Sequence, residues 1–337
     1  MIPGDIMEKQ QIQDALEKLI DPTSQKTLKE TKGVKYISVE EDKKTVNLII
    51  ALETIEDTIK HKMTREIAKV IKIDLKYHGV KIDFELLKRT DSILAREKKL
   101  KYIGIASGKG GVGKSTVAAN LALALNRLGK RVAIIDADIY GSSIPTIFDM
   151  EVRLPKADEN EKIIPFTERN IEIISTEFFM KEDTPLMWRG PMLGKMLNHF
   201  FYDVKWHDDL DYVIVDLPPG TGDVAIDIQK LIPECEILIV TTPHASASHV
   251  AVKAGFAAKE LKHSIIGVIE NMSYYKHDDQ LIPIFGEGGG KIVADKLTTD
   301  LIAQIPIGQP QSGHHSLFDM HEEIGVIYLG LANKLLR

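Results

Sequence analysis

The sequence is poor in cysteine, and this scarcity excludes a disulfide framework. One cysteine stands among the 337 residues, which fits a protein of the reducing cytosol. Long hydrophobic runs are also missing, since none approaches the roughly 18 residues of a membrane-spanning helix. The N-terminus has no long apolar core, so we expect no signal peptide there. These absences predict a soluble cytoplasmic protein.

A surplus of positive charge is missing as well. The formal net charge is −6 and the pI about 6.0, so the chain as a whole should not attract nucleic acid or acidic membranes. Hydrophobic residues make up 44% and charged residues 27%, which is typical of a soluble protein with a core of ordinary size. The length allows two or three domains.

The first 90 residues predict a small α+β domain. Residues 8–20 have the pattern of a helix that stops at Asp21-Pro22. A second helix carries apolar residues at helical spacing from Ile59 to Val70. Strands are predicted at 34–41, 44–52 and 80–87, with a turn around Asp42-Lys43. The resulting order is α-β-β-α-β.

Residues 88–101 hold six basic and two acidic residues and show no clear hydrophobic face. We interpret 91–101 as a basic linker between domain 1–90 and domain 102–337. A solvated connector is the favoured interpretation of this charge, ahead of a nucleic-acid contact.

From Tyr102 onward, strands, loops and helices alternate. Several strands are nearly continuous apolar runs, as parallel strands buried on both faces require. The predicted strands are 102–107, 131–136, 171–176, 211–216, 236–241, 264–270 and 301–306, with helices such as 114–128 and 245–261 between them. This pattern predicts an α/β fold with a doubly wound, mostly parallel sheet, and functional groups at the carboxyl ends of its strands.

The stretch "GKGGVGKST", residues 108–116, follows the first of these strands and fits the phosphate-binding pattern G-x-x-x-x-G-K-[ST]. Glycines let backbone N–H groups turn toward phosphate oxygens, and the next helix points its positive end at them. Lys114 is then expected to reach the β- and γ-phosphates, and the Ser115 hydroxyl to ligate Mg²⁺.

The same loop also contains G-x-G-x-x-G, which is a dinucleotide-binding pattern with Asp136 as its acidic partner. Lys114-Ser115 favours a triphosphate, because a dinucleotide loop needs neither that charge nor that metal ligand. Asp216 adds a second carboxylate at the end of an apolar strand, where a Mg²⁺ partner is expected. Gly220 and Gly222 beyond it suit a loop that responds to the γ-phosphate.

Lys109 is a second lysine in this loop, and a solvated side chain would be its ordinary interpretation. However, "KGGVGKST" resembles the deviant Walker A motif of the family that includes Mrp, MinD, ParA and the nitrogenase iron protein. In that family the extra lysine contacts the nucleotide of the other subunit. The resemblance therefore implies a homodimer with ATP at the interface and a catalytic Lys109 acting in trans.

The resemblance also assigns roles beyond the two lysines. It makes Asp138 the catalytic residue that handles the attacking water, and it places Asp136 nearer the metal with Ser115 and Asp216. Pro243 and Asn271 would line the adenine, although Asn271 could also be a simple turn former. The nucleotide site implied by the resemblance comprises Gly108, Lys109, Gly110, Gly111, Val112, Gly113, Lys114, Ser115, Thr116, Pro243 and Asn271.

Three further stretches resemble the Mrp-type iron–sulfur cluster carrier ATPases in particular. They are "MWRGPMLGKML" (187–197), "DLPPGTGD" (216–223) and "FGEGGG" (285–290). The small domain at the front resembles the one that bacterial members carry before the ATPase domain. The resemblance thus extends over nearly the whole chain.

The sequence departs from this family in the residues that would bind the iron–sulfur cluster. Members of this family carry C-x-x-C between the "NMS" and "FGEGGG" stretches, and two such pairs in a dimer supply four thiolates for one cluster. Here residues 274–284 contain no cysteine. We interpret His277, Asp278 and Asp279 as a solvated hairpin tip rather than as metal ligands. Cys235 is expected to be a buried structural thiol.

The sequence as a whole indicates a homodimeric, Mg²⁺-dependent ATPase of the Mrp type. By resemblance, it would bind iron–sulfur clusters and transfer them to apoproteins. The alternative is an ATP-switched regulator that binds DNA or a protein partner and has lost the cluster. A pseudo-ATPase scaffold is disfavoured, because every phosphate-handling residue is present.

Overall fold

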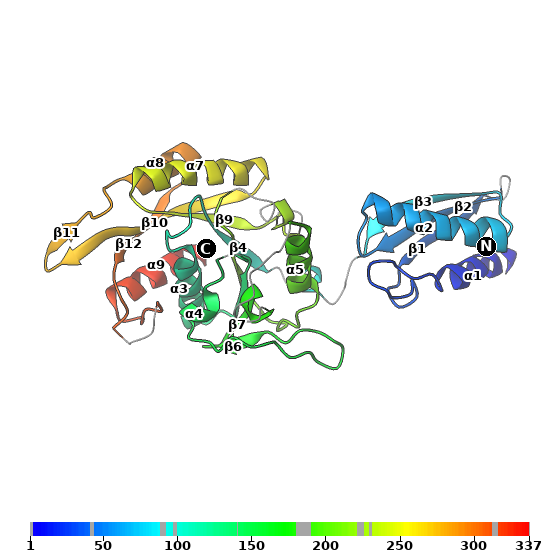
Figure 1. Ribbon diagram of the computed structural model, residues 1–337, viewed down its shortest axis with the longest axis horizontal. Helices are drawn as coiled ribbons and strands as arrows, with labels where there is room; N and C mark the ends of the chain where they lie inside the picture. Colours follow the sequence, from blue (N-terminus) through cyan, green and yellow to red (C-terminus); the bar gives the residue numbers. More distant parts are fainter. Residues whose placement is uncertain are drawn as a thin grey trace. The chain divides into compact units, whose positions relative to one another are not determined.

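The computed structural model shows two compact units, Met1–Thr90 and Asp91–Arg337 (Figure 1). It describes residues 3–40, 44–87, 92–96, 100–139, 141–179, 190–220, 226–228, 231–311 and 316–336. The predicted turn at Asp42-Lys43 lies outside these ranges, as do Gly222 and residues 187–189 of the "MWRGP" stretch.

The first unit has the predicted order α-β-β-α-β. Its elements are α1 (Pro3–Leu16), β1 (Val34–Glu40), β2 (Thr45–Leu52), α2 (Asp57–Lys69) with a π-helical turn at Val70–Asp74, and β3 (Gly79–Leu86). In this sheet β2 is the central strand, antiparallel to β1 and parallel to β3. Alternate β2 residues, Val46, Leu48 and Ile50, face a core that also contains Met63 and Ile67.

The first helix spans Pro3–Leu16 rather than the predicted 8–20. The chain turns back after it, and Ile20 pairs with Thr27 in an isolated antiparallel bridge. The buried carboxylate of Asp21 holds this turn by accepting backbone hydrogen bonds from Thr23 at 2.8 Å and Glu53 at 3.0 Å. Residues 17–20 therefore belong to a turn that the helical pattern did not reveal.

The second unit is built on one large sheet, and within the described residues it has nine strands in the order β11-β10-β9-β4-β8-β5-β7-β6, with β12 paired to β10. The strands are β4 (Lys101–Ser107), β5 (Val132–Asp136), β6 (Phe166–Glu168), β7 (Ile171–Ser175), β8 (Tyr212–Asp216), β9 (Glu236–Thr241), β10 (Ser264–His277), β11 (Gln280–Ile282) and β12 (Leu301–Ile307). β6 and β11 are antiparallel to their neighbours and the other pairings are parallel. The predicted mostly parallel sheet is thus confirmed.

Helices cover both sides of this sheet (Figure 1). They are α3 (Lys114–Arg127), α4 (Ile144–Ile147), α5 (Gly190–Tyr202), α7 (Ala245–Glu260), α8 (Gly289–Leu297) and α9 (Glu323–Leu335). α3 packs with α9 on one side, and α7 packs with α8 on the other. No helix in the described part of the chain is long and apolar enough to cross a membrane.

The central strands bring distant carboxylates together. β5 and β8 are buried along their whole length, because parallel strands at the centre of a doubly wound sheet have helices on both faces. Their register places Asp136 directly opposite Asp216, and Asp216 lies beside Ile105 of β4. Both carboxylates therefore stand at the carboxyl edge of the sheet, next to the loop that follows β4.

The stretch predicted as a basic linker is not uniformly exposed. Ile93, within a short 3-10 helix at Ile93–Ala95, is buried in the core of the second unit, and so is Leu100. Arg96 donates hydrogen bonds to the backbone carbonyls of Trp206 and His207. Ile93 and Leu100 thus belong to the core, although most residues around them in the sequence are charged.

β10 continues well beyond the predicted end at residue 270. Its last residues form a hairpin with β11, in which Tyr275 pairs with Ile282 and His277 with Gln280. Asp278 and Asp279 form the turn between them, so the interpretation of this region as a hairpin tip is confirmed. Tyr275, Leu281 and Ile282 are exposed on this hairpin.

Candidate functional site

A glycine loop connects β4 to α3 at the carboxyl edge of the large sheet. Gly111 and Gly113 adopt positive φ angles of +80° and +83°, which a residue with a side chain rarely adopts. A Cβ at Gly108 would lie 2.2 Å from the backbone carbon of Val250, so this glycine permits close approach of α7. The loop backbone is therefore shaped by glycine at three of its positions.

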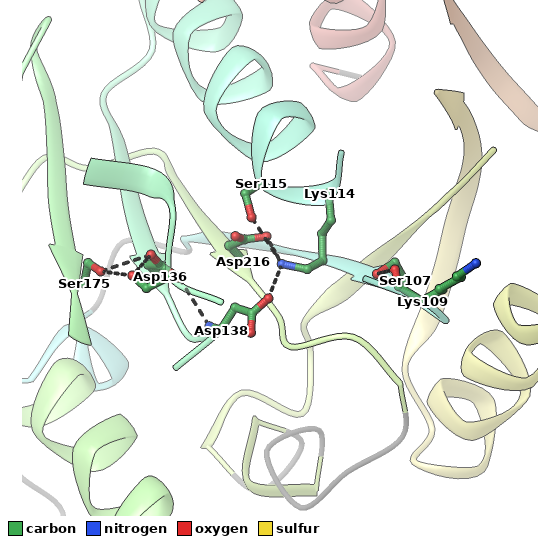
Figure 2. A network of polar contacts seen from close by, with 9 residues as sticks. Ser107, Lys109, Lys114, Ser115, Asp136, Asp138, Ser175 and Asp216 are labelled. Atoms are coloured by element: carbon green, nitrogen blue, oxygen red, sulfur yellow. Dashed lines mark hydrogen bonds and ion pairs between the residues drawn. The ribbon is translucent and has the colours of Figure 1, made fainter. Parts of the chain in front are cut away.

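The ammonium of Lys114 lies inside a cluster of oxygen atoms at the start of α3 (Figure 2). Its Nζ atom is 2.7 Å from Oδ1 of Asp216 and 3.2 Å from Oδ2 of Asp138. It also donates to the Ser115 hydroxyl at 3.4 Å. The lysine, the serine and both carboxylates predicted around the phosphates thus lie together.

Burial and neighbouring charges shift the pKa values of this cluster in opposite directions. Burial alone would lower the pKa of the Lys114 ammonium, but the carboxylates of Asp216 and Asp138 outweigh it and raise that pKa. Burial raises the pKa of the Asp216 carboxyl, while Lys114 opposes this shift. Lys114 is therefore a fully charged cation, and it stabilises the ionised form of the buried Asp216.

Asp216 presents one oxygen that is free to take a further partner. Oδ1 is engaged by Lys114, but Oδ2 is buried and has no hydrogen-bond partner among the described residues. A buried carboxylate oxygen without a donor is costly, so a cation or a water ligand of one would suit it. The adjacent Ser115 hydroxyl adds a second oxygen of the hard type that Mg²⁺ prefers. These residues fit Mg²⁺.

Asp136 has a different environment from Asp216. Its Oδ2 accepts hydrogen bonds from the hydroxyls of Ser142 at 2.6 Å and Ser175 at 3.0 Å, and its Oδ1 accepts one from the backbone N–H of Asp138 at 3.3 Å. Burial, together with the charge of Asp216, raises the pKa of Asp136 to about 7. The sequence pattern did not reveal the two serines, although Ser142 lies within "DADIYGSS".

Lys109 lies apart from this cluster. Its side chain is exposed and points away from Lys114 and the carboxylates (Figure 2). Its backbone is fixed, because the Ser107 hydroxyl donates to the Lys109 carbonyl at 3.1 Å. The loop therefore holds the backbone of Lys109 while its ammonium projects outward.

A cavity of about 440 Å³ opens in front of the loop. Its lining includes Lys109, Gly110, Gly111, Gly113, Lys114, Ser115, Thr116, Asp138, Pro218 and Pro219. Those prolines follow Asp216, and the backbone N–H of Gly220 donates to the Ser107 carbonyl at 2.8 Å. The segment after β8 is thus tied to the base of the loop.

Of the two residues predicted near the base, Asn271 contacts the glycine loop and Pro243 lies against α8. The Asn271 side-chain amide donates to the Val112 carbonyl at 2.9 Å, and a Cβ at Gly113 would lie 2.1 Å from its Nδ2. Pro243 follows β9 and lies close to α8, since a Cβ at Gly289 would be 2.3 Å from the Pro243 carbonyl oxygen. The end of β10 is therefore packed onto the glycine loop.

The lone cysteine lies elsewhere. Cys235 precedes β9, whereas Thr241 and Pro243 lie at and beyond the carboxyl end of that strand. Its side chain is buried, and burial raises the pKa of its thiol. The prediction of a buried thiol is confirmed. In the described residues, no three or more His, Cys, Asp and Glu side chains are arranged to hold a metal ion.

Comparisons with known proteins agree with the division of the chain and with the loop. Residues 99–320 match the family model described as NUBPL iron-transfer P-loop NTPase. Residues 9–83 match the model described as iron-sulfur cluster assembly protein. Each model falls within one of the two units of the structure.

Curated relatives align with nearly all of the chain. A protein of Bacillus subtilis named iron-sulfur cluster carrier protein is 38% identical, over 96% of this chain and 97% of its own. A protein of the same name from Haemophilus influenzae is 32% identical, over 97% of this chain and 91% of its own.

Solved structures support the fold of the second unit. A nucleotide-binding protein from Archaeoglobus fulgidus in complex with ADP has a TM-score of 0.52 at 29% identity, over 69% of this chain and 86% of that one. The cell division ATPase MinD of Pyrococcus furiosus has a TM-score of 0.52 at 21% identity, over 71% of this chain and 99% of that one, and shows the fold alone. The glycine loop, the family model and the full-length relatives converge: the chain belongs to the Mrp-type iron–sulfur cluster carrier family of P-loop ATPases.

Proposed function

We propose that this chain binds and hydrolyses Mg²⁺-ATP at the loop 108–116. The observation that carries this proposal is the position of the Lys114 ammonium, held by Asp216 and Asp138 at the start of α3. Phosphate oxygens placed there would meet a fixed positive charge, the N–H groups of the loop and the positive end of a helix. The remaining loop residues, from Gly108 to Thr116, would surround the phosphates.

Four side chains would take part in catalysis, namely those of Ser115, Asp136, Asp138 and Asp216. Ser115, Asp216 and Asp136 would hold Mg²⁺, either directly or through water, which suits the free Oδ2 of Asp216. When bound, Mg²⁺ neutralises charge that develops on the phosphate oxygens. Asp138 would orient the attacking water and accept its proton, and ADP and phosphate would be the products.

The nucleotide base would be recognised by residues outside the carboxylate cluster. Asn271 and Pro243 are proposed to line the adenine. Asn271 already contacts the loop through Val112, so its side chain is held near the place where a nucleotide would enter.

Lys109 would complete a neighbouring subunit rather than its own. Its ammonium is exposed and points away from Lys114 and the carboxylate cluster in this conformation (Figure 2). A homodimer that sandwiches two nucleotides would place this charge on the γ-phosphate bound by the partner. Such a cation stabilises the negative transition state.

Steady-state hydrolysis and equilibrium binding test the ATPase proposal. Lys114→Ala should abolish binding of Mg²⁺-ATP, whereas Asp138→Asn should retain binding and lose at least about a hundredfold in kcat. Lys156→Ala, a change at an exposed lysine, serves as the charge-matched control. ATP binding by Lys114→Ala at wild-type affinity would contradict the proposal.

The cargo of this ATPase would be an iron–sulfur cluster for delivery to apoproteins, and the names of the full-length relatives support this assignment. A specific observation supports a second candidate, an ATP-switched regulator of a DNA or protein partner. Residues 274–284 contain no cysteine, and the hairpin formed there exposes His277 and Asp278 instead. Cys235 is buried and could supply at most one thiolate per subunit, whereas a bridging [4Fe–4S] cluster takes four per dimer.

Anaerobic reconstitution with iron and sulfide, followed by desalting, separates these two candidates. About four iron and four sulfide per dimer would be expected for a bridging [4Fe–4S] cluster. Cys235→Ala, run in parallel, shows whether that thiol contributes. If neither iron nor sulfide is retained, the chain does not carry the cluster itself. ATP-dependent binding to duplex DNA across a salt series would then test the regulator.

A further inference from the structure

The carboxylate of Glu270 is buried next to Asn271, which is proposed to line the adenine. Its side chain is 1% exposed, and both oxygens accept hydrogen bonds. Oε1 accepts from the Ser273 hydroxyl at 2.6 Å and from the Gln304 amide at 2.8 Å. Oε2 accepts from the backbone N–H of Gly290 at 2.5 Å. Each of these donors comes from a different segment of the chain.

Those segments are a bulge in β10, strand β12 and the first turn of α8. Between Asn271 and Tyr275 the register of β10 against β12 shifts, and Met272 in this interval has a positive φ of +54°. Ser273 lies in the bulge, whereas Gln304 lies on β12. Glu270 therefore holds an irregular stretch of β10 at a fixed position relative to its neighbours.

The contact with α8 needs glycine at two positions. A Cβ at Gly290 would lie 2.7 Å from the Glu270 Cβ, so the helix can approach the carboxylate only without a side chain there. A Cβ at Gly289 would lie even closer to the Pro243 backbone, 2.3 Å from its carbonyl oxygen. The first turn of α8 thus lies between Glu270 and Pro243, and the hydrogen bond to Gly290 sets its position.

The three donors to Glu270 are neutral groups, so its carboxylate is not part of an ion pair with them. A buried carboxylate among neutral donors is expensive, and the amino-terminal end of α8 compensates only part of that cost. A glutamine would fit the same space without the charge. Retaining a carboxylate allows three donors to be accepted at once, which an amide cannot do.

We propose that Glu270 is a positioning residue for recognition of the nucleotide base. It fixes the bulge from which Asn271 reaches the glycine loop, and through α8 it fixes Pro243 on the other side. This inference rests on the proposed ATP site, because it assigns to Glu270 the placement of two of that site's residues. Glu270 does not line the cavity in front of the glycine loop, so its effect should be confined to the base end of the site.

Parallel titrations with Mg²⁺-ATP and Mg²⁺-tripolyphosphate test this separation, since the second probe has the phosphates without the base. In Glu270→Gln, an amide N–H₂ would face one of the existing donors and disrupt the network. We expect the Kd for ATP to rise about tenfold, the factor that 1.4 kcal/mol represents. The Kd for tripolyphosphate should stay within about twofold of wild type.

Two milder variants accompany this one. Gln304→Ala and Ser273→Ala each remove one donor but keep the carboxylate and its bond to Gly290, so each should raise the Kd for ATP by a smaller factor without changing that for tripolyphosphate. If Glu270→Gln does not fold, these two variants decide the question by the same criterion.

Equal losses for both probes would overturn the proposal, because Glu270 would then serve the fold as a whole. So would unchanged ATP affinity in the variants, or a wild-type chain that binds ATP no more tightly than tripolyphosphate. A wild-type chain that binds neither probe would instead contradict the proposed ATPase function itself.

Discussion

The ammonium of Lys114 lies 2.7 Å from Oδ1 of Asp216, and both side chains are buried. The lysine proposed to hold phosphate is therefore already paired with the carboxylate proposed to support the metal. A phosphate group that binds Lys114 competes with Asp216 for the same ammonium. Mg²⁺ beside the free Oδ2 of Asp216 would supply the compensating positive charge, so the metal and the nucleotide should bind together.

The Lys114–Asp216 pair should stabilise the metal-free protein. Lys114→Met leaves the Asp216 carboxylate buried without its cation, and removing one partner of a buried pair costs about 3–5 kcal/mol. The double variant Lys114→Met/Asp216→Asn should recover the part of that loss that comes from Asp216, whereas the Asp138 carboxylate still lacks its cation. Urea denaturation with a chelator present measures both free energies of unfolding. Lys109→Met, a change at an exposed lysine, is the control, and equal stability of Lys114→Met and wild type would contradict the pairing.

Two glycines of the same loop should respond differently to substitution. Gly108→Ala places a methyl group 2.2 Å from the Val250 backbone, so the loop or α7 must move. Overpacking of this kind costs about 1–3 kcal/mol, which should appear as a lower Tm. At Gly110 a Cβ meets nothing within 4 Å, and Gly110→Ala should leave the Tm unchanged. Similar Tm values for the two variants would show that the contact of α7 with the loop is not as described.

Asp136 should make the stability of the metal-free protein depend on pH. Its pKa is about 7 in the folded chain and about 4 in an unfolded one. Between these values the folded state binds the extra proton, so the contribution of Asp136 to stability is largest below about pH 4 and is lost as the pH rises through 7. The shift corresponds to at most about 4 kcal/mol.

Asp136→Asn removes this titration and leaves the other ionisable groups in place. Chemical denaturation of both proteins across this pH range gives the difference in their free energies of unfolding. The stability of wild type relative to the variant should decline as the pH rises. A difference that is constant with pH would mean that Asp136 is ionised throughout.

Cys235 should be unreactive in the folded protein. It is buried, and burial raises the pKa of its thiol, so little thiolate is present at neutral pH. A thiol-specific reagent should label less than about a tenth of the native protein in the time that labels the denatured chain completely. Rapid stoichiometric labelling of the native protein would make Cys235 available as a metal ligand and would favour the carrier assignment.

The features that sequence predicted well are those set by local pattern. The glycine loop, the strand before it and the helix after it follow from residues adjacent in the chain, and "VAIID" and "YVIVD" can be buried on both faces only inside a parallel sheet. Once the sheet order is known, the pairing of Asp136 with Asp216 follows from the strand ends.

Features that depend on contacts between distant segments were not predicted. The three-residue strands β6 and β11 are too short to show a periodic pattern. The network of Glu270 with Gln304 and Gly290 joins residues 20 to 34 positions apart, and no spacing rule connects them. The sequence pattern did not predict that Ile93 is buried, because charged residues surround it in the chain.

In the proposed dimeric ATPase, Lys109 of one subunit acts on the nucleotide bound by the other. Lys109→Ala and Asp138→Asn should each lose at least about a hundredfold in kcat as separate proteins, while both still bind Mg²⁺-ATP. In a heterodimer of the two, the site of the Lys109→Ala subunit keeps its own Asp138 and receives Lys109 from the Asp138→Asn subunit. One site in that heterodimer is then complete.

Mixing these two inactive variants in equal amounts and measuring ATP hydrolysis is the most direct test. Random exchange makes half of the dimers mixed, and each mixed dimer has one complete site of two, so about a quarter of wild-type activity should return. Subunit exchange is verified by separating differently tagged heterodimers. Verified heterodimers with no recovered activity would contradict the account, because Lys109 would then act only within its own subunit or not at all.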